Sequence, residues 1–294
     1  MALKIALQSA YSTLRRWWAR GKIWISKSVA KDLQCIADLL LEDEYSPIWS
    51  QYIGLLVPCD ATHSILSDAS YAGIGGWTLN FGALMWRVTR EDLLAFGFNM
   101  KSIGPATNEP TDPAQQGLHI NPLEFLAAII NLWLALKCIS LGLPCSTGTI
   151  LDLLSDNTTA LSWTHVAATT PNPDLQQLAR FASALFVQAA RLLTRVQPSH
   201  IPGLLNEEVD TLSLCSKSGQ IPSWELVISQ HCLLQTCRIC LLPRKLLYTL
   251  AHTISSPQTA VIFDEVTTDL LTLDLNFLPI GSLAKDLTSS LQPA

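Results

Sequence analysis

The sequence has few charged residues and no long uninterrupted apolar run. Charged residues make up 15% of the 294 positions and apolar residues 49%, which excludes a disordered chain and is typical of a globular protein with a large core. The most apolar stretch, Leu123 to Leu143, is interrupted by Glu124, Asn131 and Lys137, so we expect a buried helix there and no membrane association. The net charge of −5 means that any contact with nucleic acid would be local.

The cysteines lack the regular spacing of a disulfide framework. Eight irregularly spaced cysteines in a chain of this size favour reduced thiols in an intracellular setting, cytoplasmic or nuclear. One local group contains a C-x-x-C pair that would suit zinc: His231, Cys232, Cys237 and Cys240. A structural zinc site usually needs two well-spaced ligand pairs, and these cysteines lie in an apolar run that predicts a packed helix. Both interpretations stay open.

Composition divides the chain into three zones. Residues 1–56 are basic, rich in tryptophan and helical in pattern, and we treat them as an N-terminal extension. Residues 57–218 alternate short β-like runs with helical stretches, which is the pattern of a layered α/β domain. Residues 219–294 contain helical fragments and a Thr/Leu-rich tail, which predict a helical C-terminal extension. No internal repeat is present.

The central zone begins with a pattern typical of three antiparallel strands. The predicted strands are residues 64–70, a run around 77–81, and residues 83–88. Three glycines would permit a tight turn between the first and second strands; these are Gly73, Gly75 and Gly76.

A βαβ unit follows the three strands. Asn121 and Pro122 predict an N-cap and a first helical position, and the helix that they begin leads to a strand from Thr149 to Ser155. The two strands of such a unit are parallel and usually adjacent. We therefore expect Asp68 and Asp156 to be neighbours.

The last part of the central zone predicts one more strand between two helices. An amphipathic helix is expected over residues 173–194, followed by a fifth strand near residues 196–201. Asn206-Glu-Glu-Val-Asp210 then begins a final helix.

Four acids from different predicted elements are candidates for metal binding: Asp68, Glu124, Asp156 and Asp210. Glu124 and Asp210 lie in first helical turns, where the helix dipole favours a carboxylate. Magnesium prefers oxygen ligands, and two such ions can activate a water and stabilise the leaving oxygen of a phosphodiester. Any one of these acids alone would be interpreted as a cap or a solvated surface group.

The local sequence around all four acids resembles ribonuclease H. The matching segments are Ser67 to Trp77, Ile120 to Glu124, Leu154 to Asn157 followed by Ala160, and His200 to Leu212. The chain is most similar to the ribonuclease H domain that follows reverse transcriptase in retroelements of long-terminal-repeat or tyrosine-recombinase type, over residues 57–218. The resemblance implies an α/β fold with a five-stranded mixed sheet flanked by helices. It also implies cleavage of the RNA strand of an RNA–DNA hybrid with two Mg²⁺ ions, or Mn²⁺.

The resemblance also implies a role for each acid and for one histidine. Asp68 would bind both metals, Glu124 and Asp156 mainly one of them, and Asp210 the other. His200 falls at the auxiliary histidine position, where it would assist proton transfer or product release. An exposed loop histidine without such a role is the alternative.

Three residues near the acids are candidates for contacts with the hybrid. Asn157 matches a hybrid contact of the family, although a turn or cap role explains it equally well. Ser70 and Gly73 could approach the minor groove, where a 2′-hydroxyl distinguishes RNA from DNA. Glycine at such a position is more often a matter of turn geometry.

Basic residues offer two further candidates for substrate binding. Arg180, Arg191 and Arg195 are predicted to lie within about 60° of one another on one helix face, where they would follow phosphates or simply be solvated. The N-terminal zone interleaves basic residues with tryptophans; these are Arg15, Arg16, Trp17, Trp18, Arg20, Lys22 and Trp24.

The chain departs from the family pattern in two respects. The interval between Asp68 and Glu124 is long, and its acids are rivals for the second ligand position: Glu91, Asp92, Glu109 and Asp112. No Tyr-x-Asp-Asp polymerase motif is present, so the chain is not a complete reverse transcriptase, and a separate polymerase domain becomes a candidate partner. A polyprotein fragment or a decayed gene copy would fit this.

Three functions remain open at the level of sequence. The first is a metal-dependent endonuclease specific for RNA–DNA hybrids. The second is a catalytically inactive scaffold or nucleic-acid-binding fragment with the same fold. The third is another nuclease with clustered acids, such as a junction resolvase or an integrase-like strand transferase.

Overall fold

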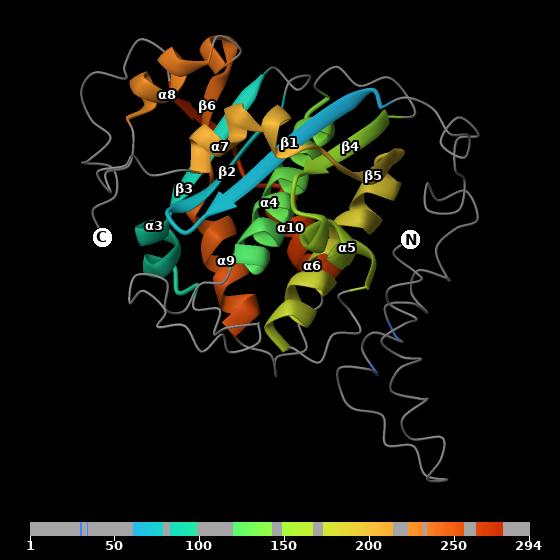
Figure 1. The fold of residues 1–294 in the computed structure, drawn as a ribbon. Helices are drawn as coiled ribbons and strands as arrows, with labels where there is room; N and C mark the ends of the chain where they lie inside the picture. Colours follow the sequence, from blue (N-terminus) through green and yellow to red (C-terminus); the bar gives the residue numbers. More distant parts are fainter. Residues whose placement is uncertain are drawn as a thin grey trace.

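A mixed sheet is the centre of the structure (Figure 1). The computed structural model describes residues 30, 34, 61–78, 83–98, 120–142, 149–166, 173–213, 223–231, 234–255 and 263–278. In these ranges the strands are β1 (His63–Ser70), β2 (Gly73–Thr78), β3 (Leu84–Thr89), β4 (Thr149–Ser155), β5 (Thr194–His200), β6 (Arg238–Leu241) and β7 (Asn276–Leu278). The seven strands lie in the order β5-β4-β1-β2-β3-β6-β7.

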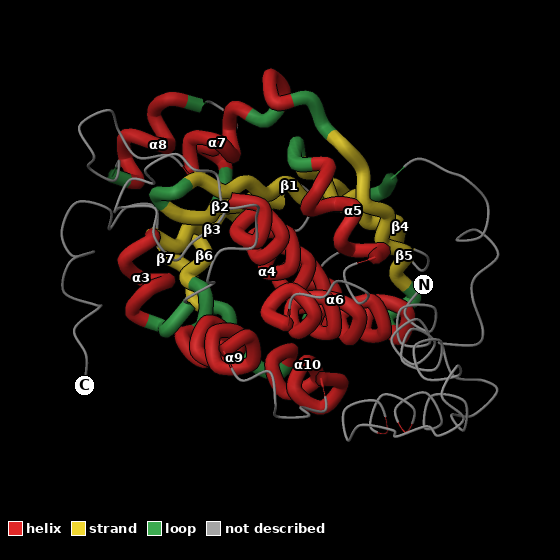
Figure 2. Tube along the Cα trace, turned by 60° about the horizontal axis from the view of Figure 1, so that its bottom comes forward, coloured by secondary structure: helices red, strands yellow, loops and turns green. Residues whose placement is uncertain are grey.

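Helices cover both faces of this sheet. They are α3 (Arg90–Ala95), α4 (Ile120–Ser140), α5 (Thr158–Val166), α6 (Pro173–Arg191), α7 (Glu207–Ser213), α8 (Trp224–Gln230), α9 (Arg244–Ser255) and α10 (Phe263–Leu271), with the 3-10 helices η4 (Gly203–Leu205) and η5 (Leu234–Thr236). Figure 2 shows α7 and α8 on one face and α4, α6, α9 and α10 on the other. The α/β class and the flanking of a mixed sheet by helices are therefore confirmed.

The expected antiparallel meander is present, but its glycines have another role. β1 pairs with β2, and β2 with β3, in antiparallel register. Gly73, Gly75 and Gly76 lie within β2, whereas Tyr71 and Ala72 form the turn. The predicted turn position was wrong because close packing, not turn conformation, requires small residues here.

The βαβ unit is confirmed. β4 lies beside β1 in parallel register, and β5 lies parallel to β4 on its other side. The crossover helix α4 begins at Ile120, so Asn121 lies in its first turn and not at the N-cap position.

The predicted number of five strands was wrong. β6 pairs in parallel with β3, and β7 pairs antiparallel with β6. Both strands come from the zone 219–294, which therefore contributes to the sheet as well as providing α8, α9 and α10. Strands of four and three residues are too short to give a readable alternation of apolar and polar side chains.

The helix α4 is the centre of the larger apolar core. Every residue from Pro122 to Ile139 is buried, because the sheet covers one side of the helix while α6 and α10 cover another. Among the described residues, α4 is the one helix long and apolar enough to span a membrane by length and composition, and 94% of its most apolar window is buried inside the fold. Its buried Lys137 donates through Nζ to the carbonyl oxygen of Leu271, at the end of α10, over 2.8 Å.

Helix α6 ends earlier than the sequence pattern indicates. The helix was expected to continue to residue 194, but its last residue is Arg191. Leu193 then adopts a left-handed conformation with a φ of 52°, and the chain turns directly into β5. Arg195 consequently lies on a strand and not on the helix.

Candidate metal centre

The strand register places two of the four predicted acids side by side. Leu66 of β1 is paired with Leu154 of β4. Asp68 lies two residues beyond Leu66 on β1, and Asp156 lies two residues beyond Leu154, directly after β4 ends. Because alternate residues of a strand share a face, equal offsets on parallel neighbours bring these side chains together.

The short helix α7 brings the third acid. Asp210 lies in its first turn, and the helix packs on β1 and β2. This close approach requires Gly75, since a Cβ at that position would lie 2.6 Å from the Cβ of Leu212. One oxygen from each of Asp68, Asp156 and Asp210 lies within 4.8 Å of the others.

The fourth acid is buried close to this group. Glu124, in the first part of α4, is only 5% exposed, and its Oε2 has no hydrogen-bond partner. Glu124 does not belong to the group of acids whose carboxylate oxygens all lie within 4.8 Å of one another. Burial, together with the charges of Asp68, Asp156 and Asp210, raises the pKa of Glu124 to about 9.

The aspartates also have raised pKa values. Burial is the largest cause of the rise for Asp68, to about 7, and the charges of Asp210 and Asp156 add to it, while a hydrogen bond from Ser213 opposes it. Burial and the charge of Asp156 likewise raise the pKa of Asp210, against a hydrogen bond from Asn206. In the described part of the chain, no lysine or arginine is among the groups that shift these pKa values.

This arrangement fits a divalent cation. Clustered carboxylates repel one another, and here no basic side chain of the described residues neutralises them. A bound cation would stabilise their ionised form. Oxygen donors from carboxylates are the ligands that Mg²⁺ prefers. The unpartnered Oε2 of Glu124 provides an independent indication, because a buried polar atom ordinarily has a partner.

Comparisons with protein-family models, curated proteins and solved structures gave no significant match.

The rival acids do not join the centre where the structure describes them. Asp92 forms a capping box at the start of α3, since its backbone N–H donates to Thr89 Oγ1 over 3.1 Å and its Oδ2 accepts from the backbone N–H of Thr89 over 3.4 Å. Glu91 is exposed on the same helix. Glu109 and Asp112 lie outside the described residues. Of the described candidates for the second ligand position, Glu124 is thus the one that lies beside the aspartates.

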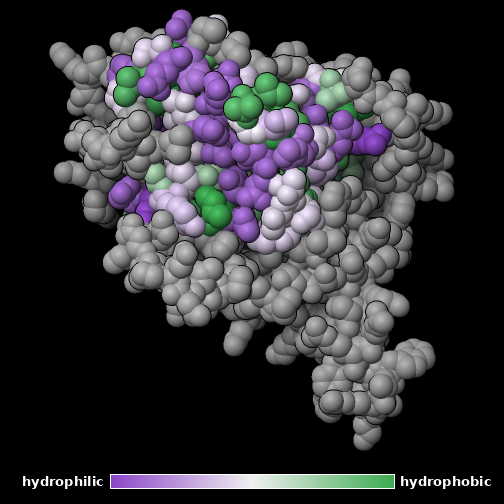
Figure 3. Space-filling view, in the orientation of Figure 1, coloured by the Kyte–Doolittle hydropathy of each residue, from purple (hydrophilic) through white to green (hydrophobic). Residues whose placement is uncertain are grey.

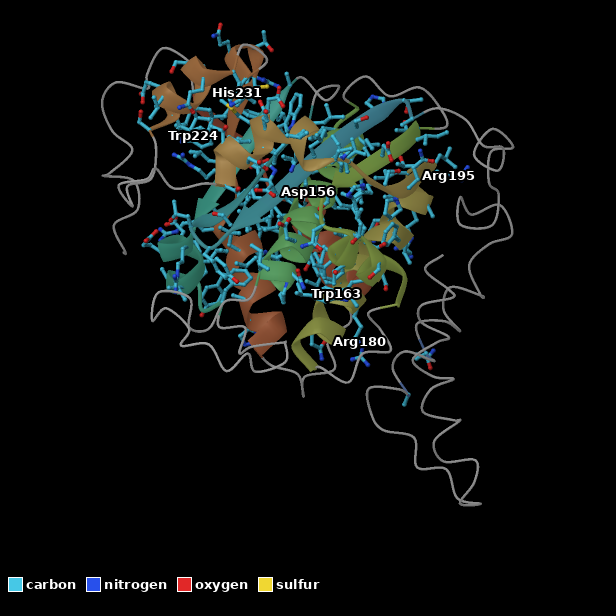
Figure 4. The ribbon with its side chains drawn as sticks, viewed as in Figure 1. Asp156, Trp163, Arg180, Arg195, Trp224 and His231 are labelled. Atoms are coloured by element: carbon cyan, nitrogen blue, oxygen red, sulfur yellow. The ribbon has the colours of Figure 1, made fainter. Side chains whose placement is uncertain are left out.

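The surface near the centre is hydrophilic and contains the predicted histidine. Figure 3 shows hydrophilic side chains across the middle of the face, where Figure 4 places Asp156. His200 is exposed at the end of β5. It is paired in register with Ser155, the residue before Asp156. The structure thus brings His200 to the edge of the sheet where the acids lie.

The three residues predicted to contact the hybrid all make close contacts within the fold. Asn157 caps α5, since its Oδ1 accepts from the backbone N–H of Ala160 over 2.9 Å. The Oγ of Ser70 donates to the carbonyl oxygen of Ser213. A Cβ at Gly73 would lie 2.5 Å from the carbonyl oxygen of Val88. A role for Asn157, Ser70 or Gly73 in substrate binding remains a prediction.

The three arginines do not share one helix face. Arg180 and Arg191 lie on α6, but Arg195 lies on β5. Figure 4 shows Arg180 on α6 and Arg195 near the outer edge of the sheet, both away from Asp156. The prediction was wrong because it extended α6 past Arg191. The N-terminal basic cluster lies outside the described residues.

The candidate zinc ligands do not converge where they are described. Cys237 precedes β6 and Cys240 lies on it, not in a helix as expected. Burial raises the pKa of their thiols to about 11 and about 12, which disfavours the thiolate that binds a metal. His231 Nε2 contacts Thr211 Oγ1 at 2.7 Å. Cys232 lies outside the described residues, and the aspartate group is the one metal-capable cluster found among those that are described.

Two polar residues next to the acids were not predicted as part of the site. Ser213 donates through Oγ to Asp68 Oδ2, and Asn206 Nδ2 lies 3.4 Å from Asp210 Oδ1. Their spacing contains a usable signal: Asn206 lies four positions before Asp210 and Ser213 three positions after it. Residues three and four apart share a helix face, so this spacing indicates that both lie near Asp210.

Proposed function

We propose that this chain is a metal-dependent endonuclease of ribonuclease H type, which cleaves the RNA strand of RNA–DNA hybrids. The observation that carries the proposal is the convergence of Asp68, Asp156 and Asp210 from three separate elements within 4.8 Å. The buried Glu124 beside them, whose Oε2 has no hydrogen-bond partner, is the second support.

The sheet also supports the proposal. Strands β1, β2 and β3 form an antiparallel meander, and β4 and β5 run parallel to β1. These five strands agree with the five-stranded mixed sheet that the resemblance implies. The strands β6 and β7 extend the sheet on the side of β3, at the edge opposite to β5.

The proposed chemistry is hydrolysis of a phosphodiester. Two divalent ions supply an activated water and stabilise the leaving oxygen. Strand β1, which carries Asp68, pairs with β4 and packs against α7. Asp68 thus adjoins both elements that bring the other aspartates, which suits the shared role that the resemblance gives it. Glu124 would add a ligand from α4, and the exposed imidazole of His200 would assist proton transfer or product release.

The centre borders an exposed segment that a nucleic-acid duplex would meet. A Cβ at Gly203 would lie 3.4 Å from Asp156 Oδ2, so η4 lies beside the acids. Within η4, Leu204 is 85% exposed and Leu205 is 64% exposed. A substrate that reaches Asp156 would therefore pass along η4 and His200.

A panel of nucleic acids tests the proposal. The full chain is incubated with Mg²⁺ and a labelled RNA–DNA hybrid, a DNA duplex or a branched DNA. We expect cutting of the RNA strand of the hybrid, and a loss of rate of more than about 100-fold in Asp68→Asn and Asp156→Asn, because each removes a charged ligand of the metal ions that stabilise the transition state. Asp152→Asn, on β4 itself, is the matched control and should retain activity.

Each other outcome points to one of the alternatives. Cutting of branched or duplex DNA in preference to the hybrid would favour a resolvase or a strand transferase. Absence of cutting by folded protein that binds Mg²⁺ would favour a catalytically inactive scaffold, for example one that packs against a polymerase domain. Either result would overturn the proposed activity.

A further inference from the structure

A buried serine contacts one of the candidate metal ligands directly. Ser213, the last residue of α7, is 2% exposed. Its Oγ donates to Oδ2 of Asp68 and lies 3.2 Å from the carbonyl oxygen of Asp210. The hydroxyl of one residue thus lies between the strand that carries Asp68 and the helix that carries Asp210.

A second serine fixes the backbone of the first. Ser70 Oγ donates to the carbonyl oxygen of Ser213, and the same Oγ accepts from the backbone N–H of Ala72 over 3.0 Å. We call Ser70 and Ser213 the serine pair. Through this pair, the end of β1 and the turn that follows it are tied to the C-terminal end of α7.

The serine pair connects the two elements that carry Asp68 and Asp210, namely β1 and α7. Asp68 and Asp210 lie far apart in sequence, so the distance between their carboxylates depends on how α7 lies on β1. The terminal torsion of an aspartate has a broad, two-fold preference, so packing alone leaves the plane of the carboxylate weakly defined. A hydrogen bond to Oδ2 restricts that plane, and hydrogen-bond partners of ligands tune metal affinity in this way.

We propose that Ser213 is a positioning residue of the metal centre, which orients the carboxylate of Asp68 and holds α7 at the distance that lets Asp210 join it. The inference rests on the proposed metal centre. It concerns metal binding, however, and does not depend on which nucleic acid is cut. Loss of such a partner typically weakens metal binding by about 10-fold to 100-fold.

Calorimetric titration of the full chain with Mg²⁺ tests the role of Ser213. The variants are Ser213→Ala, which removes the hydroxyl, and Ser213→Thr, which keeps it. Ser229→Ala is the matched control, since Ser229 also donates to a carbonyl oxygen three residues earlier, that of Leu226 at 2.8 Å, but lies exposed on α8. Ser70→Ala is a second variant, because it leaves the contact between Ser213 and Asp68 in place and removes the hydroxyl that holds the Ser213 carbonyl oxygen and the backbone N–H of Ala72. Far-ultraviolet circular dichroism confirms that each variant is folded.

We expect the Mg²⁺ dissociation constant to rise by about 10-fold to 100-fold in Ser213→Ala, by less in Ser70→Ala, and to stay near the wild-type value in Ser213→Thr and Ser229→Ala. Equal dissociation constants for Ser213→Ala and Ser229→Ala would overturn the role of Ser213. Absence of Mg²⁺ binding by the wild-type chain would overturn it together with the metal centre. Normal Mg²⁺ binding without cleavage of a hybrid would contradict the proposed function and leave the role of Ser213 supported.

Discussion

Gly75 of β2 lies directly against Leu212 of α7: a Cβ at position 75 would lie 2.6 Å from the Cβ of Leu212. The two backbones can approach this closely only because residue 75 has no side chain. The contact sets how deeply α7 lies on the sheet, and α7 carries Asp210. A packing contact on β2 therefore controls the position of a candidate metal ligand.

Substitution of Gly75 by alanine should displace α7. We expect Gly75→Ala to lower the free energy of unfolding by about 1 to 3 kcal/mol, which is the usual cost of overpacking. It should also weaken Mg²⁺ binding, because Asp210 moves with the helix. Urea unfolding and calorimetry measure the two effects.

Gly76 provides the matched control for this prediction. A Cβ at Gly76 would lie 2.8 Å from Trp86 Nε1, so Gly76→Ala should also destabilise the protein. The crowding involves the indole of Trp86, which belongs to the core on the α4 side, and leaves α7 in place. If Gly75→Ala and Gly76→Ala bind Mg²⁺ equally well, the link between Gly75 and Asp210 is wrong.

The buried carboxyl of Glu124 predicts the pH dependence of stability in metal-free protein. Its pKa is raised from 4.5 to about 9 in the folded state. Between these values the unfolded chain is ionised while the folded chain retains the proton, so raising the pH favours unfolding. Metal-free wild-type protein should therefore lose stability as the pH rises from about 5 to about 9.

Glu124→Gln should remove much of this loss. The amide is similar in shape and does not ionise, so the variant should exceed the wild type in melting temperature at pH 8 in the presence of a chelator. Thermal unfolding at pH 5.5 and pH 8, followed by circular dichroism, measures the difference. The explanation fails if the two proteins lose the same stability between these pH values.

A buried amide connects the core to the strand that carries Asp68. Asn131 on α4 accepts from Trp86 Nε1 over 2.9 Å and donates through Nδ2 to the carbonyl oxygen of Leu66 over 2.8 Å. Asn131→Leu should lower the free energy of unfolding by about 1 to 3 kcal/mol, because it leaves the buried indole N–H of Trp86 without a partner.

A double-mutant cycle tests this prediction. Trp86→Phe removes the donor that Asn131→Leu leaves unpaired, so the double variant should lose less stability than the sum of the two single changes. Denaturant unfolding of the four proteins gives the coupling free energy. Additive losses would show that the hydrogen bond between Trp86 and Asn131 does not account for the effect.

Sequence periodicity predicted the centre of the fold and failed at its edges. The runs that became β1, β3 and β4 have eight, six and seven residues, which is long enough for a strand pattern to be recognised, and the βαβ rule then placed Asp68 beside Asp156. The strands β6 and β7 have four and three residues, and they are stabilised by pairing with the edge strand β3 and with each other. Such pairing is a tertiary effect that local pattern does not encode.

The sequence predicted those site residues whose position depends on a single helix or strand. Asp210 and Glu124 follow from their places in early helical turns. Ser213 was not recognised, because its contact with Asp68 depends on how α7 packs on β1 across 145 positions of sequence. Arg195 was assigned to a helix face because nothing in the local pattern indicates that Leu193 adopts a positive φ.

The central claim is that the four acids hold two divalent ions. Crystals of the full chain soaked in Mn²⁺ test it most directly through anomalous scattering from the metal. The account predicts two peaks about 3.5 to 4 Å apart, in contact with Asp68, Asp156 and Asp210, with Glu124 beside one of them. Absence of any peak among these carboxylates, or Mn²⁺ bound only elsewhere, would contradict it.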